Sequence, residues 1–247
     1  MNCLLPNNSP AISLSIVSHG QGALIRLLLD DLAELPQQNF EVLITINIPE
    51  DESNYQDHSI PIRIIRNITP KGFGANHNAA FTHCSSPWFV VVNPDIRIKS
   101  LDFQNLISPF ENQSVAAVAP VVLSSQGNLE DSARRFPTLI RLAKRTILRR
   151  RNADYAVSDS PYSVDWVAGM FVVFRREAYQ NIGGFDHRRF FMYFEDVDIC
   201  KRIAEKGWQV IVNPYSKVIH MAQRASHRNI KHMRWHLVSA IRYMTGL

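Results

Sequence analysis

The sequence is poor in cysteine and contains no long apolar run. Its three cysteines, Cys3, Cys84 and Cys200, are odd in number and far apart, which argues against a disulfide framework and against a zinc motif. No segment reaches the roughly 18 consecutive apolar residues that a membrane-spanning helix needs. The chain also lacks a secretory signal with a basic start and an apolar core. We therefore expect a cytoplasmic protein, with any membrane contact peripheral and at the inner face of the cell membrane.

Acidic residues are missing from two segments. Residues 134–151 contain eight Lys and Arg and no acid, which leaves 19 basic against 22 acidic residues in the rest of the chain. Residues 224–244 contain five more cations, again without an acid. The net charge of +5 is thus concentrated on segments suited to an anionic partner. No nucleic-acid-binding motif accompanies them, so we expect no nucleic-acid partner.

The hydrophobic residues, 46% of the chain, form short runs separated by helical patterns. Strands are predicted at 11–20, 40–48, 61–67, 86–95, 170–174, 209–214 and 217–221, and helices at 22–35, 72–84 and 198–208. Strands that alternate with helices favour an α/β fold with a mostly parallel central sheet flanked by helices. In such sheets ligands bind at the carboxyl ends of the strands.

Polar residues follow several of the predicted strands directly. Ser18 and His19 follow the first, Asn47 and Asn67 follow the next two, and the turn 93–95 follows the fourth. The carboxylate at the end of that Asn-Pro-Asp turn can reach a hard cation such as Mg²⁺ or Mn²⁺. A β-turn held by Asx hydrogen bonds explains the same tripeptide without a metal.

The stretch "FEDVDICKRI", residues 194–203, clusters Glu195, Asp196 and Asp198. One interpretation is an acidic first turn of a helix, with Lys201 and Arg202 placed for local ion pairs. The preceding "GGFDHRRFFMYF" is rich in aromatic residues, and an apolar wall beside the acids favours a second interpretation. A carboxylate in that environment has a raised pKa and suits general-base catalysis.

Six ordered motifs give the chain a resemblance to a known family. They extend over roughly residues 11–226 and read "LSIVSHG", "RNITPKGFGANHNAAF", "VVVNPDIRI", "VDWVAGMFVVFRREAYQNIGGFD", "FFMYFEDVDICKRIAEKGW" and "NPYSKVIHMAQRAS". In this order and spacing they resemble family 2 of the inverting nucleotide-sugar glycosyltransferases, in particular the rhamnosyltransferase-like members that build bacterial surface polysaccharides.

The resemblance implies a GT-A fold forming one domain over 1–247. A nucleotide-sugar-binding half would occupy about 11–100, an acceptor and catalytic half about 101–226, and a basic amphipathic helix 227–247. The implied reaction moves a sugar, with rhamnose from dTDP-rhamnose as the first choice, from a nucleotide diphosphate donor to a hydroxyl. The implied acceptor is a saccharide or a polyprenyl-diphosphate-linked saccharide, and the implied cofactor is Mg²⁺ or Mn²⁺.

The resemblance also implies roles for individual residues. Asp196 would be the base that takes the acceptor proton, with Glu195 as its neighbour, and Asp95 would bind the metal together with His220. The implied nucleotide-sugar contacts are Ser18, His19, Asn47, Lys71, Gly72, Asn76, Asn78, Asn93 and Asp95. The implied acceptor contacts are Trp166, Gly169 and Met170. Glycines in such motifs also serve tight turns, and Trp166 also suits a core position.

One position departs from the family pattern. Many members have an Asp-Asn pair after the second strand, whose Asp contacts the base, whereas this chain has Ile46 before Asn47. The nucleobase is therefore not fixed by the motif, and UDP and GDP sugars stay open beside dTDP-rhamnose.

The basic segments agree with a lipid-linked acceptor. A helix over 139–151 would group four cations on or near one face, a pattern suited to an anionic membrane surface: Arg141, Lys144, Arg145 and Arg149. In the tail, Ile230, Met233, Leu237, Ile241 and Met244 follow helical spacing. Such stripes more often pack in a core or an oligomer than bind a membrane, so a homodimer contact is an alternative.

Three other functions are compatible with parts of the pattern. A sugar nucleotidyltransferase also uses a metal and an α/β sheet, but "IVSHGQGALIR" is a poor version of its phosphate loop. A non-catalytic basic adaptor at a membrane surface would explain the charge alone. A glycosyltransferase fold that has lost catalysis is disfavoured because Asp95, Glu195 and Asp196 are all present.

Overall fold

The computed structural model describes residues 11–36, 39–56, 58–138, 141, 153–221 and 230–246. The main sheet contains β1 (Ile12–Ser18), β2 (Phe40–Ile46), β3 (Ile62–Arg66), β4 (Trp88–Val92), β5 (Ile96–Arg97), β6 (Val115–Ser124), β8 (Tyr162–Val164), β10 (Phe171–Arg175) and β11 (Gln209–His220). A separate ribbon pairs β7 (Ala133–Arg134) with β9 (Trp166–Val167). The helices are α1 (Gly22–Ala33), α2 (Phe73–Phe81), α3 (Phe103–Ile107), α5 (Arg176–Asn181), α6 (Glu195–Glu205) and α7 (Ile230–Thr245), with 3₁₀ turns η1 (Glu52–Tyr55) and η2 (Ser108–Glu111).

The first four long strands are parallel neighbours in the order β3-β2-β1-β4. Every residue of β1 is buried, as expected for a strand covered by helices on both faces. The register aligns the ends of three strands, because Ser18 pairs with Ile46 and Ile46 with Arg66. The strands and helices predicted for this half are confirmed. The carboxyl ends of the parallel strands form one edge of the sheet.

The other half of the sheet is mixed. β10 runs antiparallel between β4 and β6, and β11 is parallel to β6. The sequence patterns did not predict β6, because Pro120 lies in its middle and proline is disfavoured inside a sheet. The sheet accommodates it through a register shift in β11 between Asn213 and Lys217, opposite Pro120. The two short strands predicted at 209–214 and 217–221 are the two parts of β11 on either side of this irregularity.

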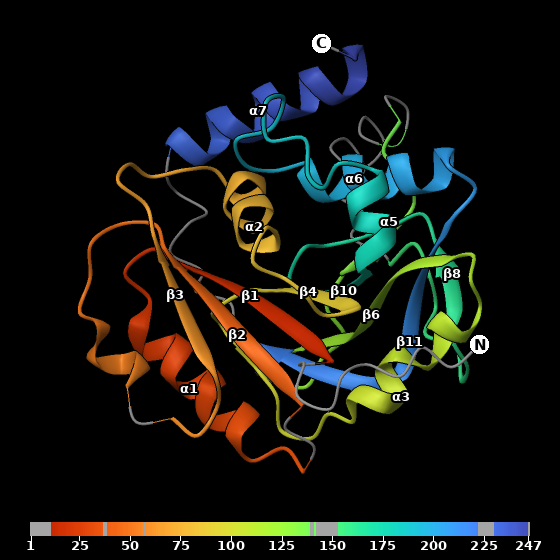
Figure 1. The fold of residues 1–247 in the computed structure, drawn as a ribbon. Coiled ribbons are helices and arrows are strands. Elements are labelled where there is room, and N and C mark those ends of the chain that lie inside the picture. Colours follow the sequence, from red (N-terminus) through yellow and green to blue (C-terminus); the bar gives the residue numbers. More distant parts are fainter. Residues whose placement is uncertain are drawn as a thin grey trace.

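Helices cover both faces of the sheet (Figure 1). On one face, buried side chains of α1, α3 and the two 3₁₀ turns pack against the strands. On the other, α2, α5 and α6 bury side chains such as Tyr179, Ile199 and Ile203. The fold class is therefore α/β with a central sheet between two helical layers, as the sequence predicted, but the sheet is mixed rather than mostly parallel, because β5, β8 and β10 pair antiparallel with their neighbours.

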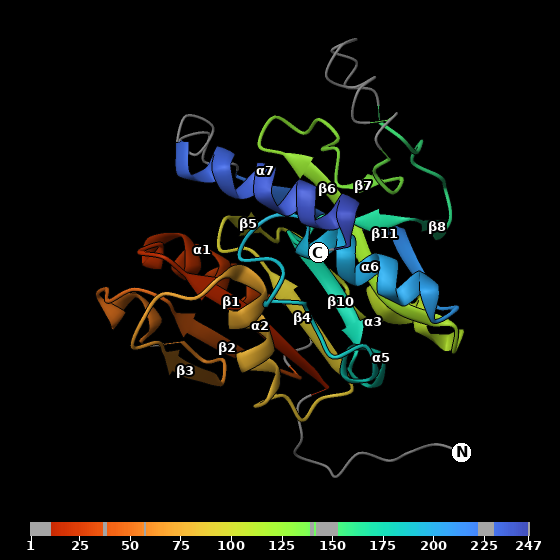
Figure 2. The same cartoon turned by 90° about the horizontal axis from the view of Figure 1, so that it is seen from above.

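The C-terminal helix α7 lies beside α6, as the two views show (Figure 1, Figure 2). Tyr243 of α7 packs with Phe190, Phe194 and Val197 in a small third core. The helix predicted over 227–247 corresponds to α7, whereas the helix predicted over 139–151 lies outside the described residues except for Arg141. None of the helices in the described ranges has the length and apolar character needed to cross a bilayer.

Candidate functional site

A polar network lies at the aligned ends of β1, β2 and β3, with Asn47 at its centre. The side-chain oxygen of Asn47 accepts hydrogen bonds from Asn67 Nδ2 and from the Lys71 amide, both at 2.8 Å. Its Nδ2 donates to Lys71 O at 2.9 Å and lies 2.8 Å from His19 Nε2. Asn67 Nδ2 also donates to Asn76 Oδ1 at 2.6 Å. The network positions His19 and fixes the loop that leads into α2.

The start of α2 is in close contact with the second half of the chain. A Cβ atom on Gly72 would lie 2.2 Å from the carbonyl oxygen of Phe191, so only glycine allows this approach. The Phe73 amide donates a hydrogen bond to the same oxygen at 3.1 Å. A Cβ atom on Gly74 would likewise meet Phe185 at 2.6 Å. The loop predicted to bind the donor is thus held against residues 185–191.

Asn78 makes contacts that are structural in kind. Its Nδ2 donates to Phe185 O at 2.8 Å, and its Oδ1 accepts from Tyr179 OH at 2.7 Å and from the Phe185 amide at 3.0 Å. These bonds hold α2 to the turn after α5. A role of Asn78 in donor binding stays a prediction.

An open cleft lies at the carboxyl end of the sheet, between the two halves. It is lined by Val17, His19, Gln21, Phe73, His77, Val92, Asn93, Pro94, Asp95 and Met192. His77 is fully buried and 2.8 Å from Ser15 Oγ through Nδ1. Burial lowers the pKa of His77 to about 3, so this ring is neutral. Of the residues predicted for the donor, His19, Asn93 and Asp95 meet in this cleft, whereas Ser18 is fully buried and is not part of its lining.

At one end of the cleft, Asp95, His220 and Glu130 form a line of polar contacts. His220 Nε2 lies 3.2 Å from Asp95 Oδ2, and His220 Nδ1 lies 2.8 Å from Glu130 Oε2. Met221 N donates to Asp95 O at 2.8 Å, which joins the turn after β4 to the end of β11. Burial lowers the pKa of His220, but hydrogen bonds with Asp95 and Glu130 outweigh this effect and raise it to about 9.

This arrangement fits a divalent cation that is shared with a phosphate ligand. Asp95 Oδ2 and His220 Nε2 lie 3.2 Å apart, so both could contact one ion once His220 has released its proton, and Glu130 holds the other ring nitrogen, as carboxylates often do behind metal-binding histidines. Within the described ranges, no three His, Cys, Asp or Glu side chains form a complete metal-binding group. Mg²⁺ is usually held by one or two carboxylates plus substrate phosphates and water, so a partial protein set is sufficient.

The first turn of α6 presents Asp196 to the strand that leads into β10. Asp196 Oδ2 accepts a hydrogen bond from the Gly169 amide at 3.2 Å, and Oδ1 accepts one from the Val197 amide at 2.9 Å. Burial raises the pKa of Asp196, while these backbone bonds lower it. Both bonds favour the charged carboxylate, which is only partly shielded from solvent.

Glu195 has a different environment from its neighbour. Its side chain is 6% exposed, and its Oε2 has no hydrogen-bond partner among the described residues. Burial, together with the negative charge of Asp196, raises the pKa of Glu195 to about 8. Two adjacent carboxyl groups in such environments share one proton at neutral pH. We assign the proton to Glu195 and the negative charge to Asp196, because only Asp196 has two amide donors.

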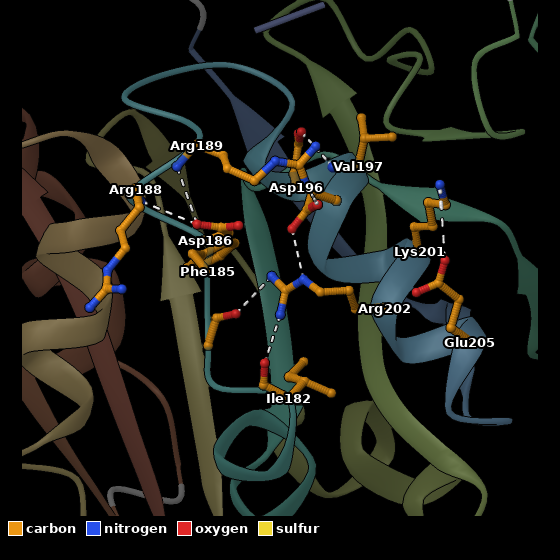
Figure 3. A network of polar contacts seen from close by, with 12 residues as sticks. Ile182, Phe185, Asp186, Arg188, Arg189, Asp196, Val197, Lys201, Arg202 and Glu205 are labelled. Carbon is orange, nitrogen blue, oxygen red and sulfur yellow. Dashed lines mark hydrogen bonds and ion pairs between the residues drawn. The ribbon is translucent and has the colours of Figure 1, made fainter. Parts of the chain in front are cut away.

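Asp198, the third acid of the cluster, is an ion-pair residue. It accepts from Arg202 Nε at 2.8 Å and lies 3.3 Å from Arg189 Nη1. Arg202 also donates to the carbonyl oxygens of Ile182 and Gly184, so the pair ties α6 to the turn after α5 (Figure 3). The interpretation of the acidic stretch as a helical first turn with local ion pairs therefore applies to Asp198. It does not apply to Glu195 or Asp196.

The residues before α6 have an uncommon backbone conformation. Tyr193 and Phe194 both have positive φ, at 70° and 66°. A side chain in the left-handed region costs about 1–2 kcal/mol per residue, so surrounding contacts must stabilise the turn. Phe194 packs against Tyr243 of α7, and Tyr193 OH lies 2.8 Å from His232 Nδ1. This turn sets the direction in which Glu195 and Asp196 leave the helix.

The predicted acceptor residues lie next to this turn and to the cleft. Gly169 separates Asp196 from Phe73, because a Cβ at Gly169 would lie 3.1 Å from Phe73 Cζ and 3.8 Å from Asp196 Cβ. Met170 O accepts from the Asn93 amide at 2.8 Å. Trp166 lies under the Arg134 guanidinium at 5.8 Å. The structure thus brings Gly169 and Met170 between Asp196 and the donor cleft.

Sequence reasoning missed three residues of this region. Glu130 contacts His220 across 90 residues of sequence, and Met192 enters the cleft from the aromatic stretch. Arg134 is placed over Trp166 by the β7–β9 pairing. No local pattern in the sequence singles out Glu130. Arg134 is the first residue of the acid-free segment 134–151, and the sequence indicated only that it belongs to a positively charged surface.

Two curated relatives match a large part of the chain. It is 30% identical over 154 residues to the N-acetylglucosaminyl-diphospho-decaprenol L-rhamnosyltransferase of Mycobacterium tuberculosis (strain H37Rv), covering 58% of this chain and 49% of that enzyme. The chain therefore spans about half the length of this relative. It is 28% identical over 254 residues to rhamnosyltransferase WbbL of Escherichia coli K12, covering 94% of this chain and 92% of WbbL.

Two solved structures share the fold. The mannosyltransferase PcManGT from Pyrobaculum calidifontis, in complex with GDP-Man and Mn²⁺, has a TM-score of 0.62 at 19% identity, covering 96% of this chain and 66% of that one. GalNAc-T7 with UDP, GalNAc and Mn²⁺ has a TM-score of 0.65 at 14% identity, covering 88% and 45%. At these identities the likeness concerns the fold, which is that of GT-A glycosyltransferases.

The family follows from a match over nearly the whole chain. The family model described as "Glycosyltransferase like family 2" matches residues 10–237, which include the cleft, the Asp95–His220 pair and the acidic turn. The resemblance read from the six motifs is thereby confirmed. The chain belongs to glycosyltransferase-like family 2.

Proposed function

We propose that this protein is an inverting glycosyltransferase of bacterial surface polysaccharide synthesis. It transfers a sugar from a nucleotide diphosphate donor to a hydroxyl of a saccharide or a lipid-linked saccharide. The donor we favour is dTDP-rhamnose, because relatives from two organisms are named rhamnosyltransferases. The observation that carries the proposal is the position of the Asp196 carboxylate: it accepts a hydrogen bond from the Gly169 amide, and Gly169 lies against Phe73, which lines the cleft.

In the proposed reaction Asp196 is the general base. The acceptor oxygen forms a bond to the anomeric carbon while the bond from that carbon to the diphosphate oxygen breaks, and the hydroxyl proton passes to Asp196. The amides of Gly169 and Val197 hold the carboxylate in its charged form before the transfer. A positioned base of this kind contributes about 100- to 10,000-fold to the rate.

Glu195 supports this role by remaining neutral. A second negative charge beside Asp196 would raise the pKa of the base further and hinder its ionisation. With Glu195 protonated and buried, only Asp196 of this pair carries a negative charge. The pair thus divides into a structural acid and a reactive base.

Asp95 and His220 would hold a Mg²⁺ or Mn²⁺ ion together with the donor diphosphate. When bound, such an ion neutralises the negative charge that develops on the departing nucleoside diphosphate. The chain supplies the rest of the donor site through His19 and Asn93, which lie in the same cleft, and through Lys71, whose loop is fixed by Asn47. Solved neighbours with Mn²⁺ support the use of a divalent ion.

The proposal includes the acceptor and the location of the protein. The mycobacterial relative is named for a diphospho-decaprenol substrate, which supports a polyprenyl-diphosphate-linked acceptor here. An enzyme acting on such a lipid works at the membrane, and we place it on the cytoplasmic face with peripheral contact through 134–151 and 224–244. Residues of about 11–100 would bind the donor and those of about 101–226 the acceptor.

A thermal-shift panel tests the donor part of the proposal. It contains dTDP, UDP, GDP, CDP and CMP, each with and without Mg²⁺ or Mn²⁺. A ligand at about 100 times its Kd adds roughly 2.7 kcal/mol to the free energy of unfolding. We expect one nucleoside diphosphate, dTDP, to stabilise the protein only when metal is present. Stabilisation by none of the nucleotides contradicts the proposed donor site.

The transfer assay is the second test. The protein is incubated with dTDP-rhamnose, Mg²⁺ and a short-chain polyprenyl-diphosphate N-acetylglucosamine, and the release of dTDP and the anomeric configuration of the product are measured. An inverted product supports the mechanism. A product with retained configuration contradicts it, because a single displacement inverts the anomeric centre.

A further inference from the structure

The outward face of α7 is apolar and has no partner within the described chain. Met233, Leu237 and Ile241 follow one another at intervals of four residues and are 68%, 62% and 52% exposed. Val238 extends the same face. On the opposite side of the helix, Ser239 is buried and in contact with the body of the protein. One side of α7 thus packs on the protein, and the other is exposed among the described residues.

The charge of α7 indicates which partner fits. No acidic residue occurs between 224 and 246, and the exposed Arg234 lies beside the apolar face, next to Met233 in the chain. A two-fold contact between copies of this helix would bring cations against cations, which disfavours it. A helix with an apolar face and basic flanks instead suits the boundary between the headgroups and acyl chains of an anionic bilayer.

The inner side of α7 contacts the segment that precedes the acidic turn. Ser239 Oγ donates to Met192 O at 2.9 Å, and Arg242 Nη1 donates to Arg189 O at 2.7 Å. Arg189 Nη2 in turn donates to Arg242 O at 2.9 Å. Phe191 packs on Trp235 with ring centroids 5.0 Å apart.

This inner contact connects α7 to both parts of the candidate site. Met192 lines the donor cleft, and Phe191 O is the atom that holds the Phe73 amide at the start of α2. The same segment includes the left-handed Tyr193 and Phe194. Contacts from α7 therefore stabilise a turn that is unfavourable by itself and that directs Asp196.

We propose that the outer face of α7, formed by Met233, Leu237, Val238 and Ile241, docks on an anionic phospholipid surface and that docking steadies residues 189–194. Docking brings α7, and with it the acidic turn, to the lipid surface. The inference that docking serves transfer to a lipid-linked acceptor rests on the proposed function. The inference that α7 docks on lipid does not. The two can be tested separately, because nucleotide binding needs no vesicle.

Flotation with lipid vesicles tests the docking. The full chain is mixed with vesicles of phosphatidylcholine alone or of phosphatidylcholine with an equal share of phosphatidylglycerol. We expect binding to the anionic vesicles only, weakened by added salt. The double variant Leu237→Ser/Ile241→Ser should bind about tenfold less, because it removes two of the inserted side chains. Leu27→Ser is the matched control, since Leu27 is 41% exposed on α1, and it should bind like the wild type.

Two results overturn the docking proposal. One is equal vesicle binding by the double variant and the wild type. The other is a stable dimer of the wild-type chain, measured by light scattering, that the double variant loses, since the face would then be an interface between copies. The metal-dependent thermal shift with dTDP serves as the folding control. If it stays normal in a variant that no longer binds vesicles, the lost docking does not come from a damaged donor site.

Hydrogen exchange tests the effect on the turn. Amide exchange of residues 189–194 is measured with and without anionic vesicles, in the wild type and in the double variant. We expect slower exchange of this segment in the vesicle-bound wild type and no change in the double variant. Unchanged exchange in a wild-type protein that is fully vesicle-bound overturns the coupling to the turn.

Discussion

The amide of Gly169 donates a hydrogen bond to Asp196 Oδ2 at 3.2 Å. Gly169 lies just before β10, and Asp196 lies in the first turn of α6. Through this contact the sheet itself determines where the carboxylate points. The bond also favours the charged form of Asp196, so position and charge have the same cause.

The first prediction concerns Asp196→Asn. The asparagine side chain has nearly the same size as aspartate but cannot take up the proton of the attacking hydroxyl. Transfer should therefore fall by about 100- to 10,000-fold. Donor binding should persist, because His19 and Asp95 line the cleft and His220 contacts Asp95, whereas Asp196 is not part of the cleft lining. The measurement is the initial rate of dTDP release beside the metal-dependent thermal shift.

The control for this prediction is Glu205→Gln, which makes the same chemical change at the other end of α6. Glu205 is exposed and lies 3.9 Å from Lys201. Its variant should keep both transfer and stability. Near-normal transfer by Asp196→Asn would mean that another group is the base.

The fold could be predicted from the sequence where local patterns and tertiary structure agree. The runs that form β1, β2 and β4 are mostly apolar and almost entirely buried because both faces of the sheet are covered, and polar residues follow each of them. β6 was not predicted because it contains Pro120, and proline is disfavoured inside a sheet. The strand forms because its pairing with β11 is irregular opposite this residue. That compensation lies about 90 residues away and leaves no local signal.

The sequence indicated which types of residue the candidate site contains, but not that its three acids have different environments. The stretch 194–203 contains three acids within four positions, and their sequence neighbourhoods are alike. Tertiary contacts separate the three acids. Arg189 and Arg202 form ion pairs with Asp198, and the Gly169 amide donates a hydrogen bond to Asp196. Glu195 is buried, and its Oε2 has no hydrogen-bond partner among the described residues. These contacts join segments far apart in the chain, so no spacing rule contains them.

The second prediction concerns the pH dependence of stability. Burial raises the pKa of Glu195 in the folded state from 4.5 to about 8, so between these values the folded protein holds a proton that the unfolded chain has released. The contribution of Glu195 to stability is therefore largest at low pH within this window and falls as pH rises, by up to about 1.4 kcal/mol per pH unit. Above the folded pKa the loss is complete.

Glu195→Gln should remove most of this dependence, because the amide is neutral at every pH. Urea unfolding of both proteins across this window, from weakly acidic to weakly basic pH, measures the slope of the unfolding free energy. The variant should be the more stable protein at the alkaline end. Parallel slopes would show that Glu195 is not the group whose pKa is raised.

The third prediction concerns Glu130→Gln. Glu130 Oε2 lies 2.8 Å from His220 Nδ1, and a carboxylate in that position fixes the ring so that Nε2 faces Asp95. Losing such a partner typically weakens metal affinity by about 10- to 100-fold. The nucleotide thermal shift should then require more Mn²⁺ to reach its midpoint, with the same maximum.

Asp95→Ala provides the comparison for Glu130→Gln. Because it removes a metal ligand, the metal-dependent part of the shift should disappear at every Mn²⁺ concentration. Isothermal titration of Mn²⁺ in the presence of dTDP gives the affinity directly. An unchanged Mn²⁺ affinity in Glu130→Gln would limit Glu130 to a structural contact.

The last prediction concerns Gly72→Ala, which tests the contact between the two halves of the site. The added Cβ would lie 2.2 Å from Phe191 O, a backbone atom that cannot move aside without moving the 189–194 segment. The start of α2 must shift, and the bond from the Phe73 amide to Phe191 O, 3.1 Å long, is strained or lost. We expect a loss of about 1–3 kcal/mol in the free energy of unfolding.

Nucleotide affinity should fall as well, because Phe73 and Met192 both line the cleft and both depend on this contact. The matched control is Gly22→Ala at the start of α1. There the added Cβ meets only the Asn54 side chain, 2.8 Å away, which can rotate, so stability and dTDP binding should change little. If Gly72→Ala lost stability and kept full dTDP affinity, the contact with Phe191 would hold the fold together without shaping the donor site.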